Sequence, residues 1–192
     1  MCMLLNIENI EVVLELGEGQ FIEFKESLDK SFQKEIVAFA NASGGVIFLG
    51  ITDSRILKGV EITNRLKSQI QDMAYNCDPS IIISLTEISN VLAIEIKEGN
   101  NKPYSCSSGF FMRMGANSQK MSRDEVLALA IKSGRIRFDE QICNDFDWKD
   151  FDSEKFEYYL KLARISNNMP KEEILKNLRV LTSEGLTNAG VL

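Results

Sequence analysis

The chain contains no histidine, and this absence removes a large class of catalytic sites. Ser–His and Cys–His catalysis both require an imidazole, and so does every histidine-ligated metal centre. The sequence also has no glycine-rich segment ending in Gly-Lys-Ser or Gly-Lys-Thr, so the usual phosphate-binding P-loop is missing. We therefore do not expect the chain to act as a helicase by itself.

Closely spaced cysteines and long apolar runs are absent as well. Cys2, Cys77, Cys106 and Cys143 form no CxxC pair, which argues against a thiolate zinc site and a redox motif. Reduced cysteines in a cytoplasmic protein are the simpler interpretation. No apolar run approaches the roughly 18 residues of a membrane helix. The apolar start, Met1–Leu5, is too short for a signal peptide and lacks its basic flank.

The net charge of −6 argues against indiscriminate binding to nucleic acid, but the charge is unevenly spread. Between Arg113 and Arg137 six basic residues stand against two acidic ones, whereas eight acidic residues stand against two lysines in 138–157. A charge run is usually a solvated face. The basic block lies beside a predicted loop, so it is also a candidate phosphate-contact surface.

The order of predicted elements indicates an α+β domain with a mixed sheet flanked by helices. Alternation and apolar runs predict strands, helical spacing predicts helices, and Ser122-x-x-Glu125 is a capping box. Ser31 is the predicted N-cap of the first helix, and Gly44–Gly45 ends it. The predicted strands are Phe21–Lys25, Val46–Ile51, Ile81–Ile88, Val91–Lys97 and Phe110–Met114, and the helices are Phe32–Ala42, Ile62–Tyr75 and Ser122–Lys132.

We place a domain boundary after residue 137. Residues 138–152 form an acidic connector in which Trp148 is expected to anchor onto the domain. A small helical appendage follows, with a helix over Ser153–Ala163 and a second one in which Pro170 takes the first position. The apolar end at Leu192 suggests that the chain belongs to a longer protein.

Three carboxylates and a lysine lie at the ends of two short apolar segments. Glu23 and Lys25 share one face of a predicted strand, Glu18 precedes it between two glycines, and Asp53 follows the next strand. Such a cluster suits either a metal-dependent phosphodiester site or a structural charge network. From residue types alone, charge pairs and a solvated turn are the more economical interpretation.

Two further sets of residues are candidates for contact with anions. Asn41 with Gly44 and Gly45 is either a nucleotide or anion site or an ordinary helix end and tight turn. The segment after the last strand is either a phosphate-contact loop or a solvated turn. The candidates for contact with nucleic acid are Lys25, Arg113, Asn117, Ser118, Lys120 and Arg123.

The motifs Glu23-Phe24-Lys25, Ala38-Phe39-Ala40-Asn41 with Gly44-Gly45, and Gly50-Ile51-Thr52-Asp53 resemble the Schlafen AlbA-type domain over roughly residues 10 to 135. The later segments 109–115 and 121–125 fit its second half. The resemblance implies a DNA-binding domain of the kind found in RecG-like helicase-related proteins and transcriptional regulators. It also implies that Glu18, Glu23 and Asp53 match the three carboxylates of Schlafen ribonucleases.

Four functions therefore remain open, of which one is a purely structural interaction domain, favoured by the acidic pI of about 4.9. The other three are as follows. The first is a cytoplasmic nucleic-acid-binding module, for DNA or RNA, in which a homo-oligomer is allowed and no membrane is involved. The second is a nuclease in which Glu18, Glu23 and Asp53 hold Mg²⁺ or Mn²⁺ and Lys25 neutralises the scissile phosphate. The third, ATP or another nucleotide bound near Asn41, is the weakest because the P-loop is missing.

Overall fold

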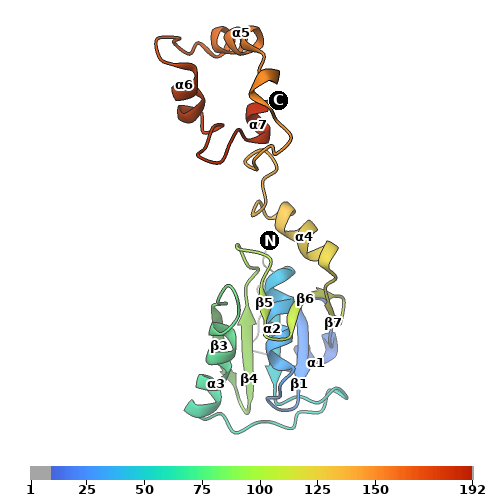
Figure 1. Ribbon diagram of the computed structural model, residues 1–192. Helices are drawn as coiled ribbons and strands as arrows, with labels where there is room; N and C mark the ends of the chain where they lie inside the picture. The colour runs from blue at the N-terminus through green and yellow to red at the C-terminus, as the bar shows by residue number, and fades with distance from the viewer. Residues whose placement is uncertain (1–9, 192) are drawn as a thin grey trace. The chain divides into compact units, whose positions relative to one another are not determined.

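The computed structural model describes residues 10–191, which divide into two compact units, residues 10–135 and residues 136–191 (Figure 1). We call them the N-terminal and C-terminal units. The mixture of helices and sheets confirms the predicted α+β class. Within the described range, no helix is both long enough and apolar enough to cross a membrane.

A four-stranded mixed sheet forms the centre of the N-terminal unit. Its strand order is β1-β2-β4-β3, with β1 parallel to β2 and the other neighbours antiparallel. The strands β3 and β4 form the hairpin that Ser89-Asn90 predicted. The strand bounds are β1 Ile22–Lys25, β2 Gly45–Leu49, β3 Ile83–Ile88 and β4 Val91–Ile96.

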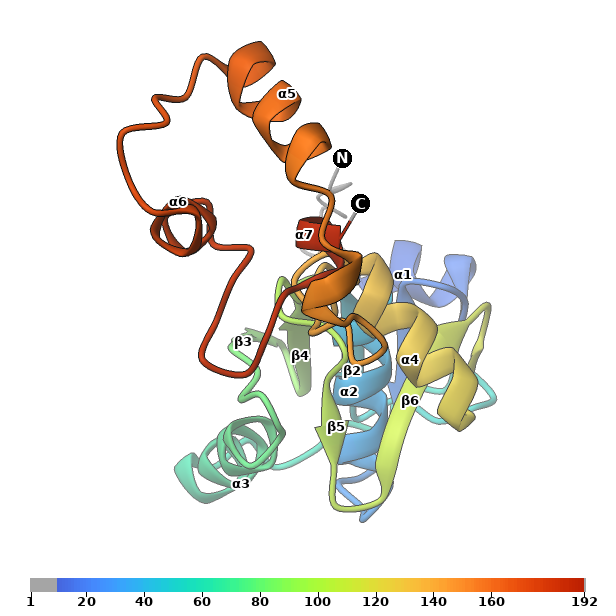
Figure 2. The ribbon, with the colours of Figure 1, turned by 45° about the horizontal axis from the view of Figure 1, so that its top comes forward.

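Helix α2 (Phe32–Asn41) lies between this sheet and a second one. The second sheet is antiparallel and contains β5 (Ser105–Cys106), β6 (Gly109–Met114) and β7 (Asn117–Lys120). Figure 2 shows β5 and β6 in front of α2. Because sheets cover both sides of the helix, almost all of its side chains are buried, including Glu35 and Asn41.

Alternation along the strands divides the core between the two faces of the central sheet. On the α2 face, Ile47 and Leu49 of β2 pack with Ile94 of β4 and with α3 (Asn64–Tyr75). On the opposite face, Val46, Phe48 and Phe24 pack beneath α1 (Ile10–Leu16). The strand β2 is therefore buried on both faces, as its unbroken apolar sequence predicted.

The hydrogen bonds expected from the sequence at helix starts form in one helix and are missing in another. The capping box of α4 (Arg123–Lys132) forms as predicted, with Ser122 and Glu125 bonded reciprocally. Ser31 takes the predicted N-cap position of α2, but its side chain makes no capping hydrogen bond to the start of the helix. The Ser31 hydroxyl instead donates to Asp29 at 2.6 Å.

The predicted loop after β6 is wrong, because residues 117–120 form strand β7. Met114 pairs with Asn117 and Arg113 with Ser118, so the turn contains only Gly115 and Ala116. Gly115 has a φ of +63°, which suits a tight hairpin turn. Backbone pairing with β6 therefore holds residues 117–120 in place and sets the directions of their side chains.

Gly44 and Gly45 are needed where α2 turns into β2. Gly44 has a φ of +76°, and a Cβ there would lie 2.6 Å from the carbonyl oxygen of Ile96. A Cβ at Gly45 would lie 2.4 Å from the ring of Phe39. The Gly44 N–H donates to the Phe39 carbonyl. These contacts match the tight-turn interpretation of the pair.

Asn41, at the end of α2, connects the helix to the second sheet. Its amide nitrogen donates to the carbonyls of Tyr104 and Phe111, both at 2.8 Å, and its amide oxygen accepts from the Tyr104 N–H at 2.7 Å. The residue is 1% exposed. The Asn41 amide is therefore fully bonded to backbone groups and has no free N–H for the predicted contact with an anion.

The C-terminal unit contains three α-helices and a short 3₁₀-helix within its described residues. The helix α5 has the predicted range, and Pro170 immediately precedes α6 where the sequence placed it as the first residue. The bounds are Trp148–Asp150 for the 3₁₀-helix, Ser153–Ala163 for α5, Lys171–Asn177 for α6 and Asn188–Val191 for α7.

An aromatic cluster holds the acidic connector to α6 within the C-terminal unit. The Trp148 ring lies 5.6 Å from the rings of both Phe146 and Phe151. The Lys171 ammonium lies 4.3 Å from the Phe151 ring centroid, a cation–π distance. These contacts lie within the C-terminal unit, and the anchoring of Trp148 on the N-terminal domain stays a prediction.

The three bonds of Asn41 lead to the first prediction. We expect Asn41→Asp to lower the free energy of unfolding by about 3 kcal/mol or more, because an oxygen replaces the donor that faces two buried carbonyls. Urea unfolding followed by circular dichroism measures this. The matched control is Asn100→Asp at an exposed position. Equal effects of the two variants would contradict the structural role of Asn41.

Candidate functional site

Strand β1 directs two charged side chains toward α2. Ile22 and Phe24 occupy the sheet face beneath α1, so the alternation of the strand turns Glu23 and Lys25 to the other face. The Lys25 ammonium lies 2.8 Å from Glu23 Oε1. The predicted sharing of a strand face therefore produces a direct ion pair.

Arg113 of β6 enters the same space and is fully buried. Its guanidinium donates to the carbonyl oxygens of Gly19, at 2.8 and 3.1 Å, and of Ile22, at 2.9 Å. Its Nη1 lies 2.8 Å from Glu23 Oε2, an ion pair without linear hydrogen-bond geometry. The group also stacks over the Phe39 ring at 4.8 Å. Every part of the guanidinium thus has a partner within the protein.

Glu35 of α2 and Ser118 of β7 complete the cluster. Glu35 Oε2 lies 3.5 Å from Arg113 Nη1, and Glu35 Oε1 lies 3.9 Å from Lys25 Nζ. The Ser118 hydroxyl donates a hydrogen bond to Glu35. We call Glu23, Lys25, Glu35, Arg113 and Ser118 the charge network. Two acids and two bases give it no net formal charge.

Burial and neighbours shift two pKa values in this network. Burial raises the pKa of Glu35, and the charge of Glu23 raises it further, although the Ser118 hydrogen bond and the two cations oppose the shift. Burial alone would lower the pKa of Lys25. The hydrogen bond and charge of Glu23, with the charges of Glu35 and Asp29, outweigh burial, so the pKa of Lys25 is raised.

The three carboxylates proposed as a metal site lie in separate environments. Glu18 Oε1 accepts the N–H of Phe24 at 3.0 Å, Glu23 is held in the charge network, and Asp53 is exposed in the turn after β2. In residues 10–191, no group of three histidine, cysteine or acidic side chains is arranged to hold a metal ion. The carboxylates present do not fit Mg²⁺ or Mn²⁺ in this geometry.

The predicted phosphate contacts divide into buried and exposed groups. Arg113 is buried, Ser118 is bonded to Glu35, and Lys25 is paired with Glu23, so these three belong to the network. Burial rules Arg113 out as a phosphate contact in this structure. Three candidates remain on the surface, and they follow one another along β7 and the start of α4: Asn117, Lys120 and Arg123.

A polar cavity of about 560 Å³ lies beside the network, between the end of α2, the loop 98–102, β6 and α4. Lys102 lies in it, but its ammonium donates to the Ala42 carbonyl at 2.6 Å and to Glu98 at 2.7 Å. Both partners are oxygens, and one of them belongs to a helix C-terminus. The cavity therefore does not offer Lys102 as a free cation.

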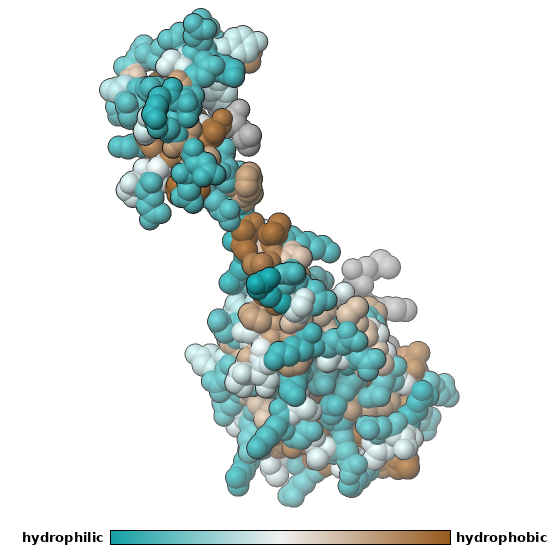
Figure 3. All heavy atoms as spheres, turned by 45° about the vertical axis from the view of Figure 1, so that its right-hand side comes forward, coloured by the Kyte–Doolittle hydropathy of each residue, from teal (hydrophilic) through white to brown (hydrophobic). Residues whose placement is uncertain are grey.

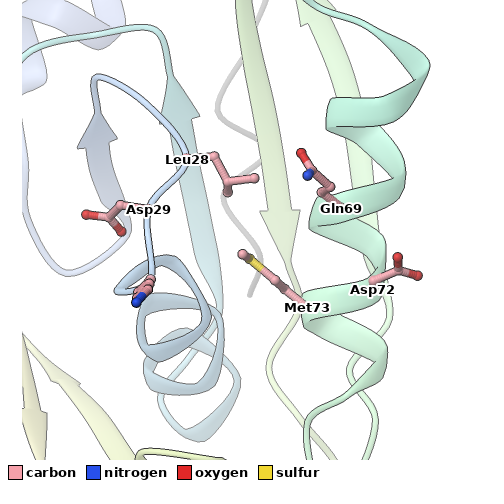
Figure 4. Close-up of a pocket in the computed structure, with 6 residues that line it drawn as sticks. Leu28, Asp29, Gln69, Asp72 and Met73 are labelled. Atoms are coloured by element: carbon pink, nitrogen blue, oxygen red, sulfur yellow. The ribbon is translucent and has the colours of Figure 1, made fainter.

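A second cavity, of about 440 Å³, lies between α3 and the loop before α2 (Figure 4). Leu28 and Met73 point into the space between these elements, whereas Asp29 and Asp72 point away from each other. Asp29 is also bonded to Ser31. The carboxylates at this cavity do not converge on a common point.

A family model for the domain described as "Schlafen, AlbA_2" matches residues 18–122, just over half of the chain. The chain belongs to the Schlafen AlbA_2 family. The match includes every member of the charge network and all of both sheets of the AlbA_2 domain. It confirms the resemblance seen in the motifs and relates the chain in general terms to nucleic acid.

Comparison with solved structures finds the DIP2311 protein from Corynebacterium diphtheriae, at 19% identity and a TM-score of 0.48. The match covers 89% of this chain and 34% of that one, so this chain spans about a third of that protein's length. No function is transferred at this level of similarity. No curated protein matches the sequence.

Glu35 is the residue of the AlbA_2 domain that the sequence reasoning missed. Phe32, Ile36 and Phe39 recur at helical spacing in the sequence, and Glu35 lies on the same side of the helix. A carboxylate on a buried stripe indicates a buried cationic partner. That signal could have suggested a network, although it does not identify Arg113 as the partner.

Loss of the Arg113 side chain should destabilise the AlbA_2 domain strongly. We expect Arg113→Ala to lower the free energy of unfolding by about 3–5 kcal/mol, because Glu23 and Glu35 would remain buried without their cation. Arg113→Lys should cost about 1–3 kcal/mol, since it keeps the charge but loses the forked contacts to two carbonyls. Denaturant unfolding measures both.

The control for this experiment is Arg123→Ala. Its guanidinium is exposed and forms an ion pair with the neighbouring Asp124. We expect a change within about 0.5 kcal/mol. A loss at Arg123 equal to that at Arg113 would contradict the assignment of Arg113 to the interior.

The raised pKa of Lys25 predicts a loss of stability at alkaline pH. The folded protein keeps this proton above the ordinary value of 10.5, where the unfolded chain releases it, so stability falls as the pH rises through this window. The stability difference between wild type and Lys25→Met should be complete below pH 10.5 and should shrink above it. Urea unfolding across that range measures the difference.

Lys58→Met is the matched control, because Lys58 forms an exposed pair with Glu26. Exposed pairs contribute little to stability, so the free energy of unfolding of this variant should stay close to that of wild type both below and above pH 10.5. A constant deficit of Lys25→Met at all pH values would refute the charge-based explanation.

Proposed function

We propose that this AlbA_2 domain binds nucleic acid, with DNA as the first choice, through β7 and the first turn of α4. We further propose that it is a recognition module of a cytoplasmic regulatory protein, of the RecG-like helicase-related or transcriptional-regulator type. Membership of the family supports the general function. The observation that supports this surface is that Asn117 and Lys120 on β7 and Arg123 at the start of α4 are all exposed.

The hairpin and the start of α4 hold the backbone that carries these side chains in one position. Ser118 is held inward by Glu35, and the ladder between β6 and β7 fixes the residues on either side of it. Lys120 follows two positions later, and the capping box at Ser122 fixes the start of α4. Ordered positions reduce the entropy that a flexible loop would lose on binding.

The charges near this surface favour weak binding that depends on salt. Arg123 lies 3.2 Å from the neighbouring Asp124, and both side chains are more than 80% exposed. Such a pair contributes little, so a phosphate can replace the carboxylate. Figure 3 shows a face of the N-terminal unit on which hydrophilic side chains predominate and hydrophobic ones are scattered.

The other two functions have less support. Metal-dependent cleavage would require Glu18, Glu23 and Asp53 to leave their present contacts and converge. Binding of ATP near Asn41 would require an amide that is already bonded to three backbone groups. Neither function is favoured by a specific contact. Adding Mn²⁺ or EDTA to the binding assay also tests for the nuclease.

The test compares two double variants with the same change in charge. Lys120→Ala with Arg123→Ala removes the proposed contacts, and Lys58→Ala with Arg65→Ala removes two exposed bases elsewhere. Affinity for labelled duplex DNA and single-stranded RNA is measured across a range of salt concentrations. We expect the first variant to reduce the slope of log affinity against log salt by roughly 1.4–1.8, at about 0.7–0.9 per lost phosphate contact.

The second double variant should leave this slope nearly unchanged. Equal effects of the two variants would attribute binding to overall charge and contradict the proposed surface. Stronger binding to RNA than to DNA would correct the choice of ligand. Cleavage that requires Mn²⁺ and is lost in Glu23→Gln would replace the binding module with the nuclease.

A further inference from the structure

Two cysteines far apart in the sequence lie beside one backbone bridge. Asp78 and Ser105 form an antiparallel pair in which each N–H donates to the other's carbonyl, at 2.9 and 2.7 Å. Cys77 precedes one partner and Cys106 follows the other. The two cysteines therefore lie one position beyond the bridge on the same side of it, where a continued antiparallel ladder would place a non-hydrogen-bonded pair.

Next to an antiparallel bridge, two side chains can approach closely enough for a disulfide. In non-hydrogen-bonded antiparallel pairs the Cα atoms are about 4.5 Å apart and the side chains lie on the same side. A disulfide requires Cα atoms about 4.4–6.8 Å apart. Cys77 belongs to the hydrophobic cluster on the α2 face of the central sheet, and Cys106 packs against that cluster. Register and packing thus place both sulfurs in one region.

Both cysteines are free thiols with weak contacts that can be exchanged. The Cys77 thiol donates to the Met73 carbonyl at 3.3 Å, and the Cys106 thiol donates to the Gly109 carbonyl at 3.6 Å. The Met73 carbonyl also accepts from Gln33 at 2.9 Å. It would therefore keep a partner after Cys77 turned toward Cys106.

We propose that Cys77 and Cys106 form an oxidisable dithiol that closes into an intramolecular disulfide when the protein meets a peroxide. The bond would join the segment after α3 to β5 in the second sheet. It is independent of the proposed binding of nucleic acid, because neither thiol belongs to the proposed surface.

The environments of the two thiols set the order of reaction. Cys106 is partly exposed, whereas Cys77 is 6% exposed and burial raises the pKa of its thiol to about 11. Since the thiolate is the nucleophile, Cys106 attacks first. The charge of Cys106 also contributes to raising the pKa of Cys77, which agrees with their proximity.

The chemistry balances in two steps. The Cys106 thiolate attacks one oxygen of hydrogen peroxide, forms a sulfenic acid and releases hydroxide. The Cys77 sulfur then attacks the Cys106 sulfur and forms the S–S bond. The sulfenic hydroxyl leaves with the Cys77 proton as water, so two thiols are oxidised and one peroxide is reduced to two waters.

The experiment treats the full chain, as wild type, Cys143→Ser and Cys106→Ser, with hydrogen peroxide. Proteolysis under non-reducing conditions and mass spectrometry then identify the linked peptides. We expect a peptide pair joined through Cys77 and Cys106 in wild type and Cys143→Ser, lost on reduction with dithiothreitol. Cys106→Ser should show no link to Cys77.

A second measurement compares the thermal midpoints of oxidised and reduced Cys143→Ser, which lacks the remaining described thiol. A disulfide that fits the native pair should raise the midpoint, because it restricts the unfolded chain. A lower midpoint would show that bridging distorts the pair and would overturn the proposal. Oxidation of Cys106 to sulfinic acid without a linked peptide would overturn it as well.

Discussion

The buried guanidinium of Arg113 is the interaction on which the arrangement of the N-terminal unit depends. It joins three parts of the chain, since β6 carries it, the segment before β1 and β1 itself accept its hydrogen bonds, and α2 supplies Glu35. An arginine without these partners would be costly to bury, because desolvation of a charge amounts to several kcal/mol. The geometry of the fork also specifies the position of β6 relative to β1.

The burial of Arg113 distinguishes two groups of basic residues that look alike in the sequence. Arg113 and Lys25 neutralise Glu23 and Glu35 and hold the layers together. Lys120 and Arg123 lie on the surface, where their charge is not balanced by buried acids. The network fixes β7 through Ser118, so the interior determines where the exposed bases of the hairpin are presented. The strand β7 therefore contributes Ser118 to the buried charge network and Lys120 to the proposed recognition surface.

Local signals predicted much of the fold but little of the site. Alternation placed Glu23 and Lys25 on one face, and the capping box located the start of α4, because both patterns depend on neighbouring residues. The burial of Arg113 depends on partners from β1 and α2, and the placement of Cys77 and Cys106 beside one another depends on the Asp78–Ser105 bridge between distant segments. Such pairings leave no local periodicity, and residue types therefore suggested a phosphate contact and unrelated thiols.

The second sheet illustrates why polar anchors are needed here. It has three short strands, and one of its faces packs on α2 through few apolar side chains, Phe111 among them. A sheet this small has little apolar area with which to fix its position. Asn41 binds the backbone at β6 and just before β5, and Arg113 binds β6 to the segments around β1. Because these bonds are directional, they select one placement of the sheet where hydrophobic contact alone would allow several.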